Sequence, residues 1–374
     1  MRLKLLLRYP RDRILASKII SNKKAPTGFA GRPVVLDLTT PNLMFDAGRH
    51  LFSIAHYAAA NDSQVMLRCR GLILSGIVHK VFGRAMLESA NVTYLESQDP
   101  IPDGSLVLSD HERSSSRLST HSGSTNQAGS SVRQIYLRIG RDLPQSSPVM
   151  PYPMHPWTLQ NEVEGETLAL ANQPERDALI LFAGCQKPRY GRPWMEEQFG
   201  VLSRLDILNM VRREFSATVV EHPRHFTNHP QASRAPSEIR ILNSRDHSIP
   251  AKDWLPTLAN AHFFLCGPGG RQPICHHLTE AMAVGTIPIL EYGDRVFPRL
   301  TDGVDSIQFS GREGLIRAIQ RIHEMDREEL NRMREQVSAF YREHLCGKKF
   351  LRRLLQDEIQ GEELAMPFHE KNLY

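Results

Sequence analysis

The sequence has 374 residues, a formal net charge of +5 and a pI near 9.0, and 23% of its residues are charged. Its hydrophobic share of 41% is close to that of soluble globular proteins and excludes a largely disordered chain. The length exceeds what one ordinary core needs and predicts two α/β domains. Because Lys and Arg are scattered, the mild positive charge favours a phosphate-bearing small ligand over nucleic acid.

Targeting signals and cysteine spacing point to the cell interior. The apolar run near the amino terminus, Leu5 to Leu7, is interrupted by Arg8 and Pro10 and is too short for a signal peptide. No stretch approaches the roughly 20 apolar residues of a membrane helix. The five cysteines show no CxxC spacing, so neither a disulfide framework nor a zinc knuckle is expected. We expect a cytoplasmic protein and leave open a peripheral contact with the inner membrane face.

Strand and helix patterns alternate in the first part of the chain. Helical patterns over residues 51–60 and 72–87 follow the first two strand candidates. The strand candidates are Val34 to Leu38, Gln64 to Arg68, Val92 to Leu95, Ser105 to Ser109 and Ile135 to Gly140. Such alternation predicts a parallel sheet with right-handed crossovers, and hence a Rossmann-like domain over residues 1–155.

Two segments break this alternation. Residues 109–134 are rich in Ser, Thr and Gly and have no periodicity. They predict a flexible insertion, because this composition buries too little apolar area to offset the entropy lost on ordering. Residues 149–157, with the letters VMPYPMHPW, are rich in proline and indicate a junction between domains.

The second half of the chain resumes the alternation. Helical patterns cover residues 202–215, 253–261 and 273–285. The strand candidates are ALILFAG at 178–184, ATVVEH at 217–222, HFFLCG at 262–267 and TIPILEY at 286–292. We therefore expect a second doubly wound domain over residues 156–345. From Gly314 to Gln360 the chain is helical and charged, and residues 346–374 are expected to form a C-terminal helix and tail that packs back across both domains.

A glycine-rich turn follows the strand candidate that ends near Cys266. Gly267, Gly269 and Gly270 precede Arg271, and Pro273 marks the expected start of a helix. Glycines let an anion approach the backbone, and free amides at a helix start carry positive potential. The turn is predicted to cradle a diphosphate with Arg271 nearby. A tight strand-to-helix connection without a ligand is the alternative.

Glu280 lies in that expected helix, and the letters AMAVG and the strand TIPIL follow it. The stretch from Trp254 to Gly293 resembles the carboxyl-terminal domain of GT-B glycosyltransferases, where a helix reading E-A-M/L-A-x-G precedes a strand reading x-P-V/I. The resemblance implies an α/β GT-B architecture of two Rossmann-like domains facing a cleft. It also implies that Glu280 binds the ribose of a nucleotide sugar, a role that suits a carboxylate because it accepts two hydrogen bonds from a diol. A solvated helix glutamate is the alternative.

Three positions depart from the patterns of that superfamily. Gln272 stands where many retaining members carry an acid. The stretch is more similar to the exostosin-like branch, in which a Ser and a basic residue precede the Glu-Ala pair, and Cys275 and His277 occupy those two places. Apart from the resemblance, His277 and Glu280 are expected to share the ligand-facing side of the helix. Because of these departures, the sequence determines neither the identity of the donor nor whether the enzyme is active.

The adjacent pair His276 and His277 raises the question of a metal. Neighbouring helix residues point about 100° apart. The letters HHLTEA also lack the second histidine that a zincin helix places with its glutamate. We therefore expect no metal and no other cofactor, with the nucleotide sugar as a substrate.

Basic side chains follow two further strand candidates. Gly184 ends the strand ALILFAG and Lys187 and Arg189 follow it, while His222 ends ATVVEH and Arg224 follows it. Ligands of doubly wound sheets bind at the carboxyl ends of the strands, and guanidinium groups bind a departing diphosphate with paired hydrogen bonds. These residues are therefore predicted to contact the donor. A solvated basic loop is the alternative.

The first domain offers candidates for a general base. Asp46 and His50 lie in the loop after the strand Val34 to Leu38, on the side expected to receive the acceptor. An inverting transferase needs a base beside the acceptor hydroxyl, and either side chain could supply it. The alternative for Asp46 is a cap for the helix that follows.

Taken together, these features predict a glycosyltransferase that moves a sugar from a nucleoside diphosphate sugar to a saccharide or glycolipid hydroxyl, in polysaccharide or cell-surface glycan synthesis. A GT-B-shaped sugar-nucleotide epimerase and an inactive glycan-binding homologue remain alternatives. A dehydrogenase is disfavoured because no G-x-G-x-x-G follows Val34 to Leu38.

Overall fold

The computed structural model describes residues 2–23, 27–44, 46–111, 132–140, 147–163, 165–221 and 237–366, without the side chains of residues 2–7. The chain divides into two compact units. The first joins Met1–Pro156 to Gly347–Tyr374, and the second is Trp157–Cys346. None of the helices in these ranges is long and apolar enough to cross a membrane.

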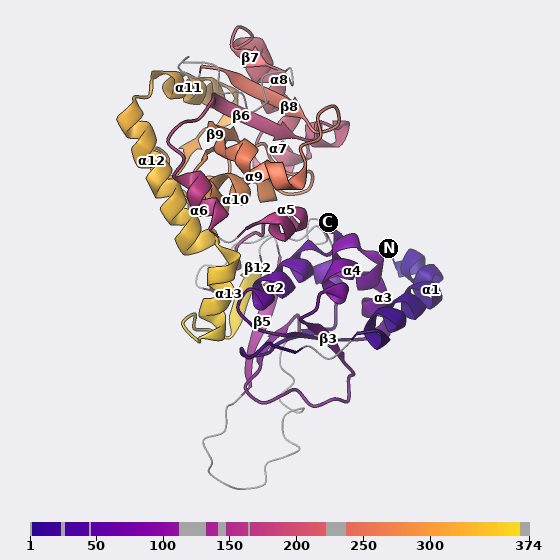
Figure 1. The fold of residues 1–374 in the computed structure, drawn as a ribbon. Coiled ribbons are helices and arrows are strands. Elements are labelled where there is room, and N and C mark those ends of the chain that lie inside the picture. Colours follow the sequence, from indigo (N-terminus) through magenta and orange to yellow (C-terminus); the bar gives the residue numbers. More distant parts are fainter. Residues whose placement is uncertain are drawn as a thin grey trace. The chain divides into compact units, whose positions relative to one another are not determined.

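The first unit contains a six-stranded parallel sheet in the order β12-β5-β4-β1-β2-β3 (Figure 1). Its strands are β1 Val34–Leu38, β2 Val65–Cys69, β3 Val92–Leu95, β4 Leu106–Ser109, β5 Arg133–Ile139 and β12 Glu363–Met366. The chain builds outward from β1 to β3 and then returns to the other side of β1 with β4. The predicted doubly wound domain is confirmed, and the C-terminal segment adds the strand β12, which sequence analysis did not predict.

The helices of the first unit flank this sheet, and α1 lies against α3. They are α1 Arg2–Ser21, α2 Arg49–Ala59, α3 Gly71–His79, α4 Val81–Glu88 and α13 Gly347–Leu355, with short 3-10 turns at Asn42–Met44 and Asp46–Gly48. The helix expected over residues 72–87 is two helices, because Lys80 is extended with a ψ of 135°. The helix α1 was also not expected. Most of the predicted insertion, residues 112–131, lies outside the described residues, and its ends belong to β4 and β5.

The second unit holds another six-stranded parallel sheet, in the order β11-β10-β9-β6-β8-β7. Its strands are β6 Ala178–Gly184, β7 Val219–Val220, β8 Ile239–Asn243, β9 Ala261–Leu265, β10 Ile287–Leu290 and β11 Ile307–Gln308. The α/β class with two doubly wound domains is therefore confirmed. Strand β8 was missed, although it pairs directly with β6 along its whole length.

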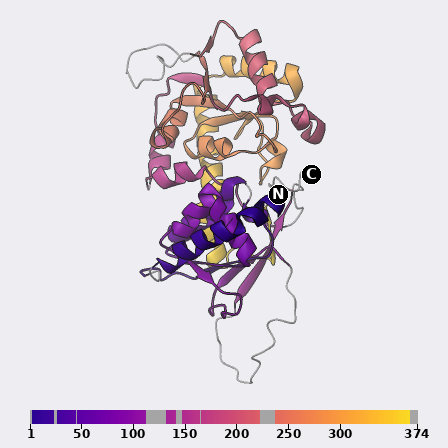
Figure 2. The same cartoon turned by 90° about the vertical axis from the view of Figure 1, so that its right-hand side faces the viewer.

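Helices accompany the strands of this unit as well, and Figure 2 shows helices beside both sheets. They are α5 Pro156–Asn161, α6 Glu166–Ala171, α7 Trp194–Phe199, α8 Arg204–Glu214, α9 Ala251–Ala259, α10 His276–Ala283, α11 Gly311–Glu324 and α12 Arg327–Phe340. A π-helical turn, Tyr341–Leu345, ends the unit. The helical pattern predicted from Gly314 to Gln360 is thus several helices, and α13 belongs to the first unit, where it packs on α2.

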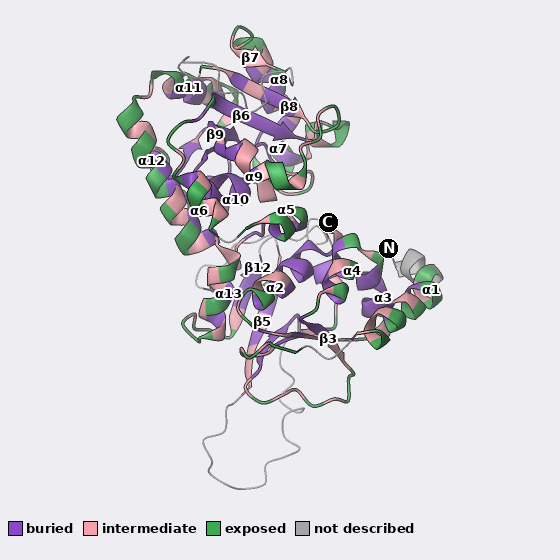
Figure 3. Ribbon diagram, in the orientation of Figure 1, coloured by how far each residue is buried: buried purple, intermediate pink, exposed green. Residues whose placement is uncertain are grey.

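The strands form the cores of both units, as the burial colouring of Figure 3 shows. All seven residues of β6 are buried, as are all four of β10. Parallel strands covered by helices have no water-facing side, so their sequences read as continuous apolar runs. Because of this pattern, the strands ALILFAG and VVLDL could be predicted from the sequence. The same pattern explains why the polar residues gather at the strand ends.

Gly48 is a position where backbone geometry demands glycine. It precedes α2 with a φ of 82°, and a Cβ atom there would lie 2.5 Å from the amide nitrogen of Gly83. We expect Gly48→Ala to lower the free energy of unfolding more than Gly28→Ala does, by about 1–3 kcal/mol, through this overlap. Gly28 is the matched control, because its φ is 88° and nothing lies within 4 Å of its added Cβ. Urea unfolding measures both, and equal losses would contradict the close packing.

Candidate functional site

The chain changes direction in the second sheet between β6 and β9. Strands β7 and β8 extend the sheet on one side of β6, and β9 to β11 extend it on the other. The connections from the carboxyl ends of β6 and β9 therefore leave in opposite directions, and a crevice between them is the usual ligand site of this fold. The register pairs Leu181 with Phe264, so extending it sets Gly184 level with Gly267.

Both of these glycines are buried, and both lie against Arg204. A Cβ atom on Gly267 would be 2.9 Å from Cγ of Arg204. A Cβ atom on Gly184 would be 3.2 Å from the His277 ring and 3.7 Å from Nη1 of Arg204. The structure thus brings together three of the predicted site residues, Gly184, Gly267 and His277, around a guanidinium that sequence analysis did not select.

Arg204 is the first residue of α8, and the start of this helix is firmly fixed. Ser203 caps the helix by accepting a hydrogen bond from the amide of Asp206 at 3.2 Å. The carboxylate of Glu291, which follows β10, accepts from the amide of Leu202 at 2.6 Å and also from that of Gly311. Burial raises the pKa of Glu291, while these two amides lower it. The end of β10 and the start of α8 are therefore tied together.

Arg204 is only 3% exposed. Its Nε donates to the carbonyl of Pro268 at 3.0 Å, and its Nη1 donates to the carbonyl of Cys185 at 3.1 Å. It lies 4.1 Å from the ring centre of Tyr190 and 5.9 Å from that of Phe182. Within the described ranges, no carboxylate pairs with it. Arg204 therefore joins the two predicted phosphate loops and keeps an uncompensated positive charge between them.

The loop after β6 carries the other predicted cations. The Arg189 guanidinium lies 4.9 Å from the ring centre of Tyr190. The Tyr190 ring therefore faces two guanidinium groups, that of Arg189 from the same loop and that of Arg204 from α8. Lys187 and Arg189 are both exposed. Across the site, a Cβ atom on Gly270 would be 3.4 Å from the Tyr190 ring. The exposed Arg271 also borders this area, and its carbonyl accepts from the Trp194 indole at 3.2 Å.

The glycine turn differs from the prediction in two respects. Its amides are not all directed outward, because Gly267 N donates to the carbonyl of Leu265 at 2.9 Å and Gly269 N donates to that of Pro273 at 3.0 Å. The helix also begins at His276 instead of Pro273, with Cys275 extended as its N-cap. The positive helix end therefore lies at the two histidines. This correction moves the expected anion position from the glycine amides toward Gly184 and His277.

Glu280 is fully buried, unlike a solvated helix glutamate. Its Oε1 accepts from the hydroxyl of Thr158 at 2.9 Å, and its Oε2 accepts from the indole of Trp254 at 2.8 Å. The Trp254 ring centre lies 5.3 Å from that of His277. The carboxylate is thus held by donors from α5 and α9. A ribose diol could reach it after displacing one of those donors, so its predicted role stays a prediction.

The two histidines lie closer together than sequence analysis expected. The ring centres of His276 and His277 are 4.2 Å apart, and one ligand atom from each lies within 4.8 Å of a carboxylate oxygen of Glu280. The argument that neighbouring helix positions diverge was therefore wrong for these side chains, because imidazole rings are long enough to offset the divergence. These three groups could hold a divalent cation such as Zn²⁺.

The remaining predicted donor residues cannot be placed. His222 and Arg224 lie outside the described residues, which end at Glu221 on one side and resume at residue 237 on the other. Strand β7 contains Val219–Val220 and lies at the edge of the sheet, two strands from β6.

In the first unit, Asp46 lies in a strained turn. Asp46 and Ala47 have φ values of 49° and 58°, which are unfavourable for residues with a side chain. The predicted alternative of a helix cap for Asp46 is wrong, since α2 has Gly48 as its N-cap and no side-chain cap. Oδ2 of Asp46 instead accepts from the Tyr152 hydroxyl at 3.1 Å and lies 3.3 Å from Nε of Arg49.

His50 lies beside this pair of interactions and is 8% exposed. Its ring meets the Tyr152 ring edge-on at 5.6 Å. A second histidine, His155, faces the same area, and burial together with Arg49 lowers its pKa to about 4, against the opposing charge of Asp46. His155 is therefore neutral near pH 7. The structure thus gathers both predicted base candidates around Tyr152.

The switch point of the first sheet lies between β1 and β4, and sequence analysis did not select it. Asp110 accepts from the amides of Thr39 and Thr40 at 2.7 and 2.9 Å and from both of their hydroxyls. His111 has one ring nitrogen 3.7 Å from Oδ2 of Asp37. Asp110 is 8% exposed and fixes the exit of β1. The signal available in sequence was an acid directly after a buried strand.

No protein-family model and no curated protein matches the chain. Three solved structures resemble it at low similarity. An α-glucosyltransferase in complex with UDP and a 13-mer DNA matches at 12% identity, covering 87% of this chain and all of that one, with a TM-score of 0.39. HepE from Anabaena in complex with UDP matches at 10%, covering 87% and 99%, with a TM-score of 0.41. WaaG, a glycosyltransferase involved in lipopolysaccharide biosynthesis, matches at 12%, covering 88% and 99%, with a TM-score of 0.37. Likenesses of this size do not indicate a function for this chain.

The buried carboxylate of Glu280 makes a prediction about stability. Trp254→Phe keeps the aromatic packing but removes a hydrogen bond to a buried charge, so it should lower the free energy of unfolding by about 1.5–3 kcal/mol. Trp194→Phe is the control, because its indole donates to a carbonyl in an exposed place and should cost about 1 kcal/mol or less. Urea unfolding of the two variants tests this. Equal losses would show that Trp254 does not stabilise the carboxylate.

Proposed function

We propose that the protein is a glycosyltransferase that binds a nucleoside diphosphate sugar at the switch point of its second sheet and transfers the sugar to a hydroxyl acceptor. The observation that carries this proposal is the buried guanidinium of Arg204, which lies between Gly184 and Gly267 with no carboxylate partner among the described residues.

An uncompensated buried charge is costly, and proteins normally pair it. Arg176 shows one structural solution within the same unit. Its guanidinium donates to the carbonyls of Ala261 and Val284 and to the Thr286 hydroxyl, and burial lowers its pKa to about 9. Arg176 lies at the amino ends of the strands, whereas Arg204 lies at the carboxyl ends, where ligands bind. An anionic ligand would supply the charge that Arg204 lacks.

A diphosphate suits this place better than a single carboxylate. Exposed Arg189 shares the Tyr190 ring with Arg204, and exposed Lys187 lies two residues before it, so positive charge continues from Arg204 into this loop. The first turn of α10 adds its amides at His276 and His277. Fixed cations of this kind stabilise the charge that develops on a departing nucleoside diphosphate. The ribose is proposed to lie toward Glu280, where its hydroxyls would replace the Thr158 or Trp254 donor.

The acceptor is proposed to bind to the first unit. In-line attack at the anomeric carbon needs a base for the acceptor proton, and Asp46 and His50 are the proposed candidates. Asp46 accepts from Tyr152 and lies beside Arg49, and the His50 ring meets the same Tyr152 ring, so both candidates lie in one cluster. The cellular role proposed from sequence is polysaccharide or cell-surface glycan synthesis in the cytoplasm, with an acceptor that reaches the protein from solution or from the inner membrane face.

Nucleotide binding tests the proposal through a matched pair of arginines. In a thermal-shift panel of UDP-, GDP-, ADP- and CMP-linked sugars, at least one should stabilise the wild-type protein. Arg204→Met should weaken the apparent affinity for that sugar nucleotide by about 10- to 100-fold, the loss of one charged hydrogen bond or more. Arg176→Met should also lower the melting temperature, because it leaves buried carbonyls unpaired, but it should keep the ligand-induced shift. An unchanged affinity in Arg204→Met would contradict the proposed donor site.

The expected independence from metal can be tested at the histidine pair. Donor hydrolysis or transfer should be unchanged after EDTA treatment and in His276→Asn, because the proposed charge stabilisation comes from fixed arginines. Zn²⁺ should likewise raise the melting temperature of the wild-type protein no more than that of His276→Asn. Activity that is lost on chelation, restored by Zn²⁺ or Mn²⁺ and absent in His276→Asn would show instead that His276, His277 and Glu280 hold a required cation.

A further inference from the structure

Helix α1 carries a concentration of positive charge. Its residues, RLKLLLRYPRDRILASKIIS, include six Lys and Arg but a single acid, Asp12. The whole chain, by contrast, has 46 Lys and Arg against 41 Asp and Glu. The positive charge of the protein is therefore unevenly distributed, with an excess on this helix.

Helix α1 packs on α3 in the antiparallel direction. At one end, Nη1 of Arg8 lies 2.6 Å from Nε2 of His79, and at the other an added Cβ atom on Gly71 would lie 1.9 Å from Nη1 of Arg13. Figure 1 shows α1 beside α3 and α4 in the first unit. Because residues 73–78 of α3 are all buried, α1 covers much of that helix and forms part of the outer surface of the unit.

The buried and exposed sides of α1 follow from its helical period. Asp12 and Ala16 are buried and mark the side that packs on the unit. Ile14 is two residues from each of them, which places it on the opposite side of the helix, and it is 59% exposed. Arg11 and Lys18 are three and four residues from Ile14, so they lie on its side of the helix, and both are exposed. The outward side of α1 therefore presents an aliphatic side chain between two cations.

Two further exposed aliphatic side chains lie at the two ends of α3. Leu72 follows the glycine that contacts the Arg13 guanidinium, and Val81 is the first residue of α4. The exposed Arg70 and Arg84 lie close to them in the chain. We call the exposed side chains within residues 8–18, 70–72 and 81–84 the α1 surface.

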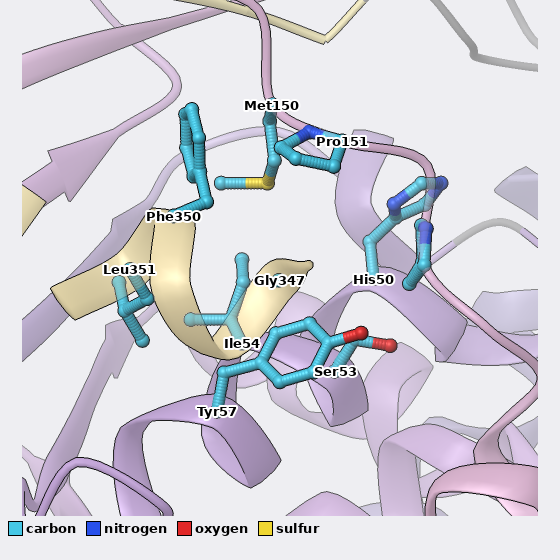
Figure 4. A pocket seen from close by; sticks show the side chains of 10 residues that line it. His50, Ser53, Ile54, Tyr57, Met150, Pro151, Gly347, Phe350 and Leu351 are labelled. Carbon is cyan, nitrogen blue, oxygen red and sulfur yellow. The ribbon is translucent and has the colours of Figure 1, made fainter. Parts of the chain in front are cut away.

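The α1 surface has almost no acid to offset its cations. Asp12 is the only Asp or Glu within its residues, and it is buried. No carboxylate among the described residues forms an ion pair with Arg11, Lys18 or Arg70. The positive charge is also local. The pocket between α2, α13 and the segment from Met150 to Pro153, elsewhere in this unit, has no Lys or Arg in its lining (Figure 4).

Cations with aliphatic side chains between them suit the surface of an anionic lipid bilayer. Lipid phosphates attract Lys and Arg, and the boundary between headgroups and acyl chains accepts the apolar side chains beside them. The long stems of Lys and Arg keep the charged ends at the level of the phosphates. A nucleic acid backbone would pair with the cations but would leave Ile14, Leu72 and Val81 in water.

We propose that the α1 surface docks the protein on an anionic lipid bilayer, with α1 parallel to the membrane plane, Ile14 inserted between the headgroups and the cations beside lipid phosphates. Attachment of this kind is reversible and weakens as the ionic strength rises. The inference goes beyond the proposed function and does not depend on it, because docking needs neither donor nor acceptor. Together with the proposed function, it favours an acceptor that is held at a lipid surface.

Vesicle co-sedimentation of the full chain tests the proposal without a nucleotide sugar. The wild-type protein should bind vesicles of equal parts phosphatidylglycerol and phosphatidylcholine about 10-fold or more tightly than vesicles of phosphatidylcholine alone. The double variant Arg11→Glu with Lys18→Glu should lose about 10-fold or more of the binding to anionic vesicles, since each cation near the surface contributes. The matched control is Arg317→Glu with Arg332→Glu, which makes the same change of charge at exposed side chains of α11 and α12 and should bind as the wild type does.

A single apolar substitution separates a bilayer from other polyanions. Ile14→Ser keeps every charge but removes the inserted side chain, so it should weaken binding to anionic vesicles by about 5-fold or more. Circular dichroism checks that each variant keeps the helical content of the wild type. If the Arg11 and Lys18 variant does not fold, Arg70→Glu with Arg84→Glu takes its place, with the same expected loss.

Three results would overturn the proposal. The first is that the wild-type protein does not bind anionic vesicles. The second is equal binding by the folded α1-surface variant and by the control in α11 and α12. The third is vesicle binding that Ile14→Ser leaves unchanged, which would show a surface for polyanions in general. Arg204→Met should bind vesicles as the wild type does, so a failure of the proposed donor site and a failure of membrane docking are measured separately.

Discussion

The second unit depends on one constraint, the reversal of strand order about β6. Because β8 and β9 pair with opposite sides of this strand, the connections that leave β6 and β9 diverge and leave the carboxyl ends of the two strands without a covering crossover. Gly184 and Gly267 lie at those ends, and the lack of side chains there lets Arg204 lie between them. The rest of the proposed donor site follows from this position, including the rings that face the guanidinium and the start of α10 beside Gly184.

The first unit is also a six-stranded parallel sheet, but β2 and β3 follow one another outward from β1, whereas β8 lies between β6 and β7 in the second unit. The switch point of the first unit is occupied by Asp110, which is bonded to the backbone and hydroxyls of Thr39 and Thr40 and so stabilises the strand exit. The strained turn of Asp46 and Ala47 lies instead directly before α2.

The sequence was sufficient where a single physical rule dominates. Continuous apolar runs identified β1 and β6, and glycines at or just after the ends of buried strands identified Gly184 and Gly267. Strand β8 was missed because its letters, IRILN, mix charged and apolar residues in a short run. Arg204 was missed because it reaches the site from the start of α8, a full loop and short helix after β6, and only tertiary packing brings it there. The spacing of His276 and His277 was misjudged because imidazole rings are long enough to offset the divergence of neighbouring helix positions.

The central claim is that a nucleoside diphosphate sugar binds between the ends of β6 and β9. Backbone amide NMR of the isotopically labelled protein during titration with the nucleotide sugars tests it most directly, because glycine amides resonate in a distinct region. The account predicts that the largest shift changes occur at Gly184, Gly267, Gly269 and Gly270, while Gly48 and Gly83 in the first unit are unaffected. Shift changes confined to the first unit, or none with any nucleotide sugar, would contradict it.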